Sequence, residues 1–159
     1  MSIVNVRTTR ERILDAANAL FLEQGYHSVG MATVAAAAGV SRQTLYVQFG
    51  SKAGLLRAMV ARSEEVAGLP RLLEVVRAQA DGLAMLRAML DAVATVEPQV
   101  YPFSRLVHAA RLEDAVAAEL WEWRMRSRLA GMREVMARLA SEGRLAPGGS
   151  VRFPTKAWE

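Results

Sequence analysis

A short run at residues 41–52, SRQTLYVQFGSK, carries side chains whose types suit contact with nucleic acid. At 100° per residue, Leu45 and Phe49 share one face of a helix, and the opposite face carries Arg42, Gln43, Tyr46 and Val47. A guanidinium can pair with guanine through two hydrogen bonds, an amide can pair likewise with adenine, and valine methyls can touch the thymine methyl. The pattern therefore predicts a helix that reads base edges in the major groove.

Neighbouring residues have donors that suit phosphate oxygens, which fix position rather than sequence. These are the hydroxyl and amide side chains of Ser41, Thr44, Tyr46 and Gln48. Lys52 follows Ser51, the expected N-cap of the next helix, where backbone amides already favour phosphate. From Gln24 to Ser63 the chain has no carboxylate, while Arg42, Lys52, Arg57 and Arg62 lie in that window. A surface that faces polyphosphate needs this charge distribution, although a chance gap in an alanine-rich stretch is the alternative.

Local signals predict the helices that must position these side chains. Thr8 and Glu11 form a capping box for a helix over residues 8–24, which Gly25 ends. A second helix is predicted over residues 31–38, with Gly30 as a weak N-cap. The connection 39–41 allows a tight turn through Gly39, and Ser41 caps the third helix. Two short helices joined by such a turn, with a longer helix before them, form a helix-turn-helix.

Residues 8–60 resemble the DNA-binding domain of TetR-type transcriptional regulators. The shared elements are Phe21, Gly25-Tyr26, Ala35, Ala38-Gly39-Val40-Ser41, Thr44-Leu45-Tyr46, Phe49, Ser51-Lys52 and Leu55-Leu56. The resemblance implies that Arg42 and Gln43 read bases and that Thr44, Tyr46, Gln48 and Lys52 contact the DNA backbone. One position departs from the family, which usually has a threonine where this chain has Gly30. We expect weaker phosphate contact there, with Thr33 as a partial substitute.

The remainder of the chain is predicted to be helical, which gives an all-α fold with an N-terminal three-helix DNA-binding domain and a C-terminal regulatory domain. The proposed divisions are a DNA-binding domain at 1–50, a linking helix at 51–67, a regulatory domain at 68–147 and an irregular tail at 148–159. In the family, the linking helix transmits the effector signal. Beyond it we expect helices over 71–80, 82–96, 98–110 and 113–141. The last has an apolar seam of Trp121, Met125, Leu129, Met132, Met136 and Leu139, and its arginines at 124, 126 and 128 are interpreted as a solvated face.

Apolar residues with a few polar groups in the C-terminal half are candidates for an effector pocket, as small-molecule sites usually combine the two. They are Met85, Met89, Tyr101, Phe103, His108, Trp121 and Trp123. Plain core packing is the alternative for each of them. No metal site or cofactor is predicted, because the chain has no cysteine and its histidines, His27 and His108, fall in different predicted domains.

Composition excludes several other classes of protein. The chain has 159 residues, a formal net charge of +4 and 52% hydrophobic residues, with no apolar signal core and no apolar run long enough to cross a membrane. We expect a cytoplasmic protein. An enzyme is not predicted, since no nucleophile, acid–base pair or metal set clusters in the sequence.

The resemblance implies a ligand-responsive regulator, expected to be a repressor, that binds an operator in double-stranded DNA and responds to a small apolar effector. It also implies a homodimer, formed in the family by two further helices. After Pro147 only GGSVRFPTKAWE follows, so the two-fold interface is expected to be reduced. The alternative is a monomeric remnant of the family that keeps the fold and binds DNA weakly without regulating, and the mass in solution would separate the two.

Overall fold

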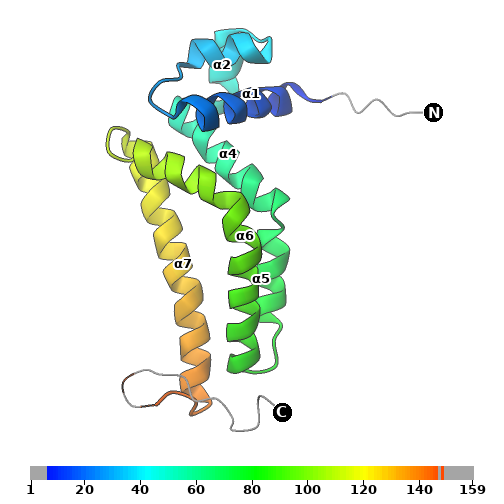
Figure 1. Cartoon of the computed structure of the whole chain (residues 1–159), viewed down its shortest axis with the longest axis vertical. Coiled ribbons are helices and arrows are strands. Elements are labelled where there is room, and N and C mark those ends of the chain that lie inside the picture. Colours follow the sequence, from blue (N-terminus) through cyan, green and yellow to red (C-terminus); the bar gives the residue numbers. More distant parts are fainter. Residues whose placement is uncertain (1–6, 147, 149–159) are drawn as a thin grey trace, which may run out of the picture.

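The structure is a computed structural model that describes residues 7–146 and residue 148. In this part of the chain the helices are α1 (Thr9–Gln24), α2 (Met31–Ala38), α3 (Arg42–Phe49), α4 (Lys52–Val66), α5 (Leu69–Arg77), α6 (Gly82–Ala110) and α7 (Ala115–Ser141). The predicted all-α fold is confirmed. Figure 1 shows α1 and α2 at one end of an elongated molecule, with α4 leading away from them toward α5, α6 and α7. None of the described helices combines the length and apolar character needed to cross a membrane.

The predicted start signals of the first helices are present. The hydroxyl of Thr8 accepts from the Glu11 amide at 3.2 Å, and the Glu11 carboxylate accepts from the Thr8 amide at 2.7 Å. Gly39 adopts the left-handed conformation, with φ 66°, between α2 and α3. Ser41 then accepts from the Thr44 amide at 3.0 Å and caps α3. The helix-turn-helix geometry is thus fixed by bonds between residues that are close in the sequence.

The prediction of separate helices over 82–96 and 98–110 was wrong, because α6 is continuous through Pro98 and Pro102. A proline within a helix removes one backbone hydrogen bond and favours a kink, and α6 changes direction along its length in Figure 1. Val96 and Val100 are buried in the same region. Packing on both sides of the prolines therefore keeps the helix continuous where local propensity favours a break.

The predicted seam of α7 is also partly wrong. Leu129 and Met132 are exposed, whereas Val135 and Leu139 are fully buried. Arg124, which we expected in solvent, is only 4% exposed. It follows Leu120 by one helical turn and so lies on the same buried face of α7, which α4 and α6 cover.

One hydrophobic core joins the N-terminal helices to the adjoining ends of α6 and α7. It combines α1–α4 residues such as Ile13, Phe21, Leu45 and Leu56 with Leu106, Val107, Ala110, Ala117 and Leu120. A second core at the opposite end packs α5, α6 and α7 through Val76, Leu83, Met85, Ala92, Val135 and Leu139. Of the N-terminal helices, α1 and α4 therefore rest directly on the C-terminal half.

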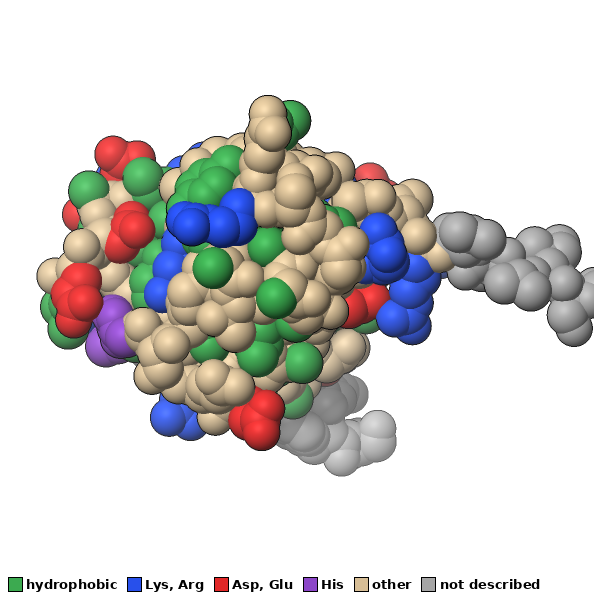
Figure 2. Space-filling view, turned by 90° about the horizontal axis from the view of Figure 1, so that it is seen from above, with side chains coloured by type: hydrophobic (Ala, Val, Ile, Leu, Met, Phe, Trp, Pro, Cys, Tyr) green, Lys and Arg blue, Asp and Glu red, His purple; other side chains and the backbone are tan. Residues whose placement is uncertain are grey.

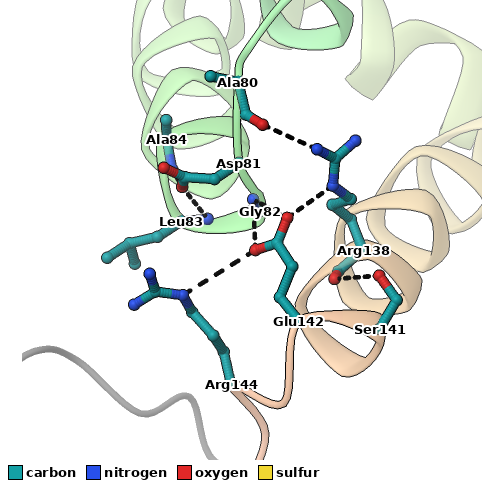
Figure 3. A network of polar contacts seen from close by, with 9 residues as sticks. All are labelled: Ala80, Asp81, Gly82, Leu83, Ala84, Arg138, Ser141, Glu142 and Arg144. Carbon is teal, nitrogen blue, oxygen red and sulfur yellow. Dashed lines mark hydrogen bonds and ion pairs between the residues drawn. The ribbon is translucent and has the colours of Figure 1, made fainter.

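A carboxylate links α7 to α6 at the end of the molecule away from the N-terminal helices (Figure 3). Glu142 follows α7 and accepts from the Gly82 amide, the first residue of α6, at 2.9 and 3.0 Å. Arg138 donates to the same carboxylate at 2.6 Å and to the Ala80 carbonyl at 2.7 Å. Asp81 caps α6 by accepting from the amides of residues 83 and 84. This network fixes the end of α7 to the start of α6.

Candidate nucleic-acid interface

The helix α3 is anchored by one face and exposed on the other. Leu45 is fully buried and Phe49 is 9% exposed, so both are held by the first core. On the opposite side Tyr46 is 42% and Val47 79% exposed. The other exposed side chains of α3 are Arg42, Gln43 and Gln48. The packing of the opposite face thus leaves the isopropyl group of Val47 available to a partner surface.

The surrounding surface suits a polyanion in its charge distribution. Figure 2, a view onto the end of the molecule that carries the N-terminal helices, shows mainly uncharged polar and apolar atoms in the middle, interrupted by basic side chains. The acidic side chains lie toward the edges of this face. This agrees with the acid-free stretch between Gln24 and Ser63 and leaves little to repel phosphate from α3.

The hydroxyl groups beside α3 are partly engaged with each other. Ser41 Oγ lies 2.8 Å from Thr44 Oγ1 and also accepts from the Thr44 amide. One of the two hydroxyl protons is used in their mutual bond, so one remains for a phosphate oxygen. Thr33 is exposed on α2, and Gly30 before it provides no side-chain cap, as the sequence predicted.

Lys52, which the resemblance predicts to contact the DNA backbone, is only partly exposed. Its Nζ lies 4.3 Å from the centre of the Tyr26 ring and 5.8 Å from that of Phe21, an arrangement typical of a cation–π contact. Burial lowers the pKa of the Lys52 ammonium, and the negative charges of Asp114 and Glu113 partly oppose that effect. The side chain is half-buried. Its ammonium lies on the ring of Tyr26, whose hydroxyl is bonded to Asp114 of the α6–α7 turn.

Sequence reasoning missed the contacts that the α6–α7 turn makes with the segment after α1. The Tyr26 hydroxyl donates to Asp114 Oδ2 at 3.3 Å, and His27 Nδ1 lies 3.1 Å from Glu113 Oε2. Burial, followed by the neighbouring Asp114 charge, raises the pKa of Tyr26. The partners are 88 residues apart for the first pair, and no local pattern could have indicated them.

The predicted effector residues are not brought together into one pocket. Met85 is buried in the second core, whereas Tyr101 is 54% exposed. His108 packs edge-on against Trp121 at 4.9 Å between ring centres. Phe103 and Trp123 line two different cavities, and Met89 packs against the second core. Core packing, the alternative considered for each residue, accounts for Met85 and Met89.

Two cavities lie along α4. The first, of about 270 Å³, is bounded by α1, α4 and α6 and is lined by Leu14, Asp15, Asn18, Met59, Arg62, Ser63, Val66, Gln99 and Phe103. The second, of about 580 Å³, lies between α4 and α7 and is lined by Arg57, Val60, Ala61, Glu64, Glu119, Leu120, Trp123 and Arg126. Small-molecule sites usually measure about 300–1,000 Å³, so the second has the more usual volume.

An ion pair between a buried arginine and a partly buried glutamate links α7 to α4 beside the second cavity. Arg124 of α7 donates to Glu64 of α4 and, at 3.3 Å, to Ser104 of α6. Because a buried charge without its partner is strongly destabilising, this contact constrains how α4 can move relative to α6 and α7. Among the described residues, no group of three or more His, Cys, Asp or Glu side chains could hold a metal ion.

The anchored and exposed faces of α3, the tight turn at Gly39 and the bracing α1 define a helix-turn-helix protein. Residues 13–59 match the family described as bacterial regulatory proteins, tetR family. UidR of Escherichia coli (strain K12), an HTH-type transcriptional regulator, is 30% identical over 119 residues, which are 75% of this chain and 53% of UidR. FasR of Mycolicibacterium smegmatis, an HTH-type transcriptional activator, is 38% identical over 85 residues, which are 52% of this chain and 37% of FasR.

The crystal structure of the TetR-family regulator PfmR from Thermus thermophilus superposes with a TM-score of 0.69 and 27% identity, covering 89% of this chain and 76% of PfmR. The chain belongs to the TetR family, as the resemblance of residues 8–60 implied. It spans about half the length of UidR and a smaller share of FasR.

Proposed function

We propose that this protein is a ligand-responsive transcriptional repressor that inserts α3 into the major groove of an operator. The observation that carries the proposal is the exposure of Arg42, Gln43 and Val47 on a helix whose other face is held by the core. Arg42 pairs with a guanine, Gln43 with an adenine, and Val47 contacts a thymine methyl. Phosphate contacts come from Thr33, Ser41, Thr44, Tyr46, Gln48 and Lys52.

The C-terminal helices receive the signal in this proposal. A small, largely apolar effector binds beside α4, and its binding changes the tilt of that helix relative to α6 and α7. The cavity between α4 and α7 supports this placement, since its lining combines the apolar side chains of Val60, Leu120 and Trp123 with charged residues. Repression is the expected direction of regulation, and a protein that acts on chromosomal DNA works in the cytoplasm. The relatives are regulators, which favours this function over that of a monomeric remnant.

Two copies of the chain bind one operator in the proposal. A helix-turn-helix dimer matches a palindromic site because its two recognition helices enter successive major grooves about one helical turn apart. Each chain supplies one α3.

Base selection from a randomised duplex library tests the DNA-binding role. We expect wild type to enrich one motif and Arg42→Ala and Gln43→Ala each to weaken binding to it by about 1–3 kcal/mol, with relaxed preference at one base position. Arg133→Ala removes an exposed arginine from α7 and should leave the motif unchanged. If both α3 variants kept the full preference of wild type, the assignment of α3 as the reading helix would be wrong.

A further inference from the structure

The α6–α7 turn reaches the DNA-binding helices through the carboxylate of Asp114. Its Oδ1 accepts from the amides of Val116 and Ala117 at 2.9 and 3.1 Å and so caps α7. Its Oδ2 accepts from the Tyr26 hydroxyl at 3.3 Å. A single side chain therefore starts α7 and also holds the connection between α1 and α2.

A second contact lies beside it. Glu113 Oε2 is 3.1 Å from His27 Nδ1, and both side chains are well exposed. Exposed pairs contribute little to stability, typically below about 1 kcal/mol. The pair therefore adds little to stability, and its relevance is that it places the Glu113 carboxylate next to the DNA-binding face.

Lys52 lies where both carboxylates can influence it. Its ammonium rests on the Tyr26 ring, whose hydroxyl is bonded to Asp114, and neither acid forms a direct ion pair with it. The negative charges of Asp114 and Glu113 favour the ammonium form of Lys52, and their attraction draws it toward the α6–α7 turn. A cation that should neutralise a phosphate is thereby partly neutralised within the protein.

We propose that Glu113 and Asp114 are positioning residues for DNA binding, which hold Lys52 on the Tyr26 ring and limit its contact with DNA phosphate. The inference rests on the proposed DNA-binding function. Because the turn joins α6 to α7, a change in the angle between these helices moves the two carboxylates relative to Lys52. The C-terminal half can thus adjust DNA affinity at the α6–α7 turn, in addition to any tilt of α4.

Binding to duplex DNA of random sequence, measured by fluorescence anisotropy at several salt concentrations, tests the proposal without knowledge of the operator. Glu113→Gln with Asp114→Asn removes both charges, and asparagine keeps the cap of α7. We expect this double variant to bind about tenfold more tightly, with the slope of log K against log salt steeper by about one, which is one additional phosphate contact. Glu23→Gln with Glu65→Gln removes two exposed carboxylates that have no side-chain partner in the described residues, and it is the matched control.

The same charge changes in a Lys52→Ala background should alter affinity no more than the control does. The inference is wrong if the double variant binds like the control, or if its gain persists without Lys52. A wild type that does not bind duplex DNA even at low salt would instead refute the proposed function. The result that refutes the positioning role therefore differs from the result that refutes the function.

Nuclear magnetic resonance of the Lys52 ammonium gives a readout that is independent of DNA. The lysines of the chain are Lys52 and Lys156, so the assignment is simple. Burial lowers the pKa of Lys52 while Asp114 and Glu113 oppose the shift, and neutralising both acids should lower that pKa further. An unchanged Lys52 pKa in the double variant would contradict the positioning role even if DNA affinity rose.

Discussion

At the residue scale, Gly54 is a position of α4 where contact with the end of α3 restricts the residue to glycine. A glycine inside a helix usually costs about 0.5–1 kcal/mol relative to alanine, so the sequence alone makes it a weakness. In the structure a Cβ at this position would overlap the carbonyl oxygen of Phe49 and lie 3.2 Å from its carbonyl carbon. Backbone atoms at the end of α3 cannot move aside as a flexible side chain can. Glycine is therefore required where α3 passes into α4.

Replacement of this glycine gives a prediction at the same scale. We expect Gly54→Ala to lower the free energy of unfolding by about 1–3 kcal/mol, as overpacking does in well-packed sites. Gly131→Ala in α7 is the matched control, because its new methyl group would meet only the terminal methyl of Met89 at 3.4 Å. It should raise the free energy of unfolding by about 0.5–1 kcal/mol. Urea denaturation measures both, and equal stabilisation by the two changes would contradict the steric argument.

At the element scale, the contact between the end of α7 and the start of α6 depends on an ionised Glu142. Hydrogen bonding from Arg138, followed by that from the Gly82 amide, lowers the pKa of this carboxyl. The amides of Ala84 and Leu83 act in the same direction on the pKa of Asp81. Gly82 also permits the close approach of the helices, since a Cβ there would lie 3.0 Å from the Leu139 backbone nitrogen.

The pH dependence of stability follows from these shifts. A carboxyl with a lowered folded-state pKa adds stability that is fully present above its unfolded pKa, about 4.5 for Glu142, and is lost as the pH falls through the folded value. We expect Glu142→Gln to be less stable than wild type near neutral pH, with the difference narrowing below about pH 4.5. Denaturation at a series of pH values measures this narrowing. Glu134→Gln, an exposed change in α7, should follow the wild-type curve, and a pH-independent deficit for Glu142→Gln would contradict the role of its charge.

At the scale of the whole molecule, the described surface of α6 and α7 carries large apolar side chains. Leu90 and Val93 of α6 and Trp123 and Leu129 of α7 are each half exposed or more. Apolar surface of this kind often marks an interface, and the proposed two-fold operator binding requires a second copy.

Light scattering at several protein concentrations, with and without a fragment of upstream DNA, measures the assembly. We expect a mass of twice 17.4 kDa, retained when DNA is bound. A dimer would direct the next step to mapping paired half-sites. A mass of 17.4 kDa at every concentration would contradict two-fold binding while leaving the reading helix itself untouched.

The sequence by itself determined α1 to α3 and the outward face of α3. The capping box at Thr8, the left-handed Gly39 and the Ser41 cap act through hydrogen bonds that span only a few residues. The exposure of Arg42 and Val47 follows from helical periodicity once Leu45 and Phe49 are assigned to the core. Such signals are local, so they can be recognised without knowing what lies elsewhere in the fold.

Only the tertiary structure decided the features that depend on distant partners. Packing carried α6 through Pro98 and Pro102, and the position of Glu64, 60 residues away, let Arg124 be buried. The placement of Lys52 on Tyr26 beside the α6–α7 turn has the same origin, as does the dispersal of the predicted effector residues. In each case the free energy gained by burial must offset the cost of desolvation or of lost backbone hydrogen bonds. That burial exists only when segments far apart in sequence come into contact.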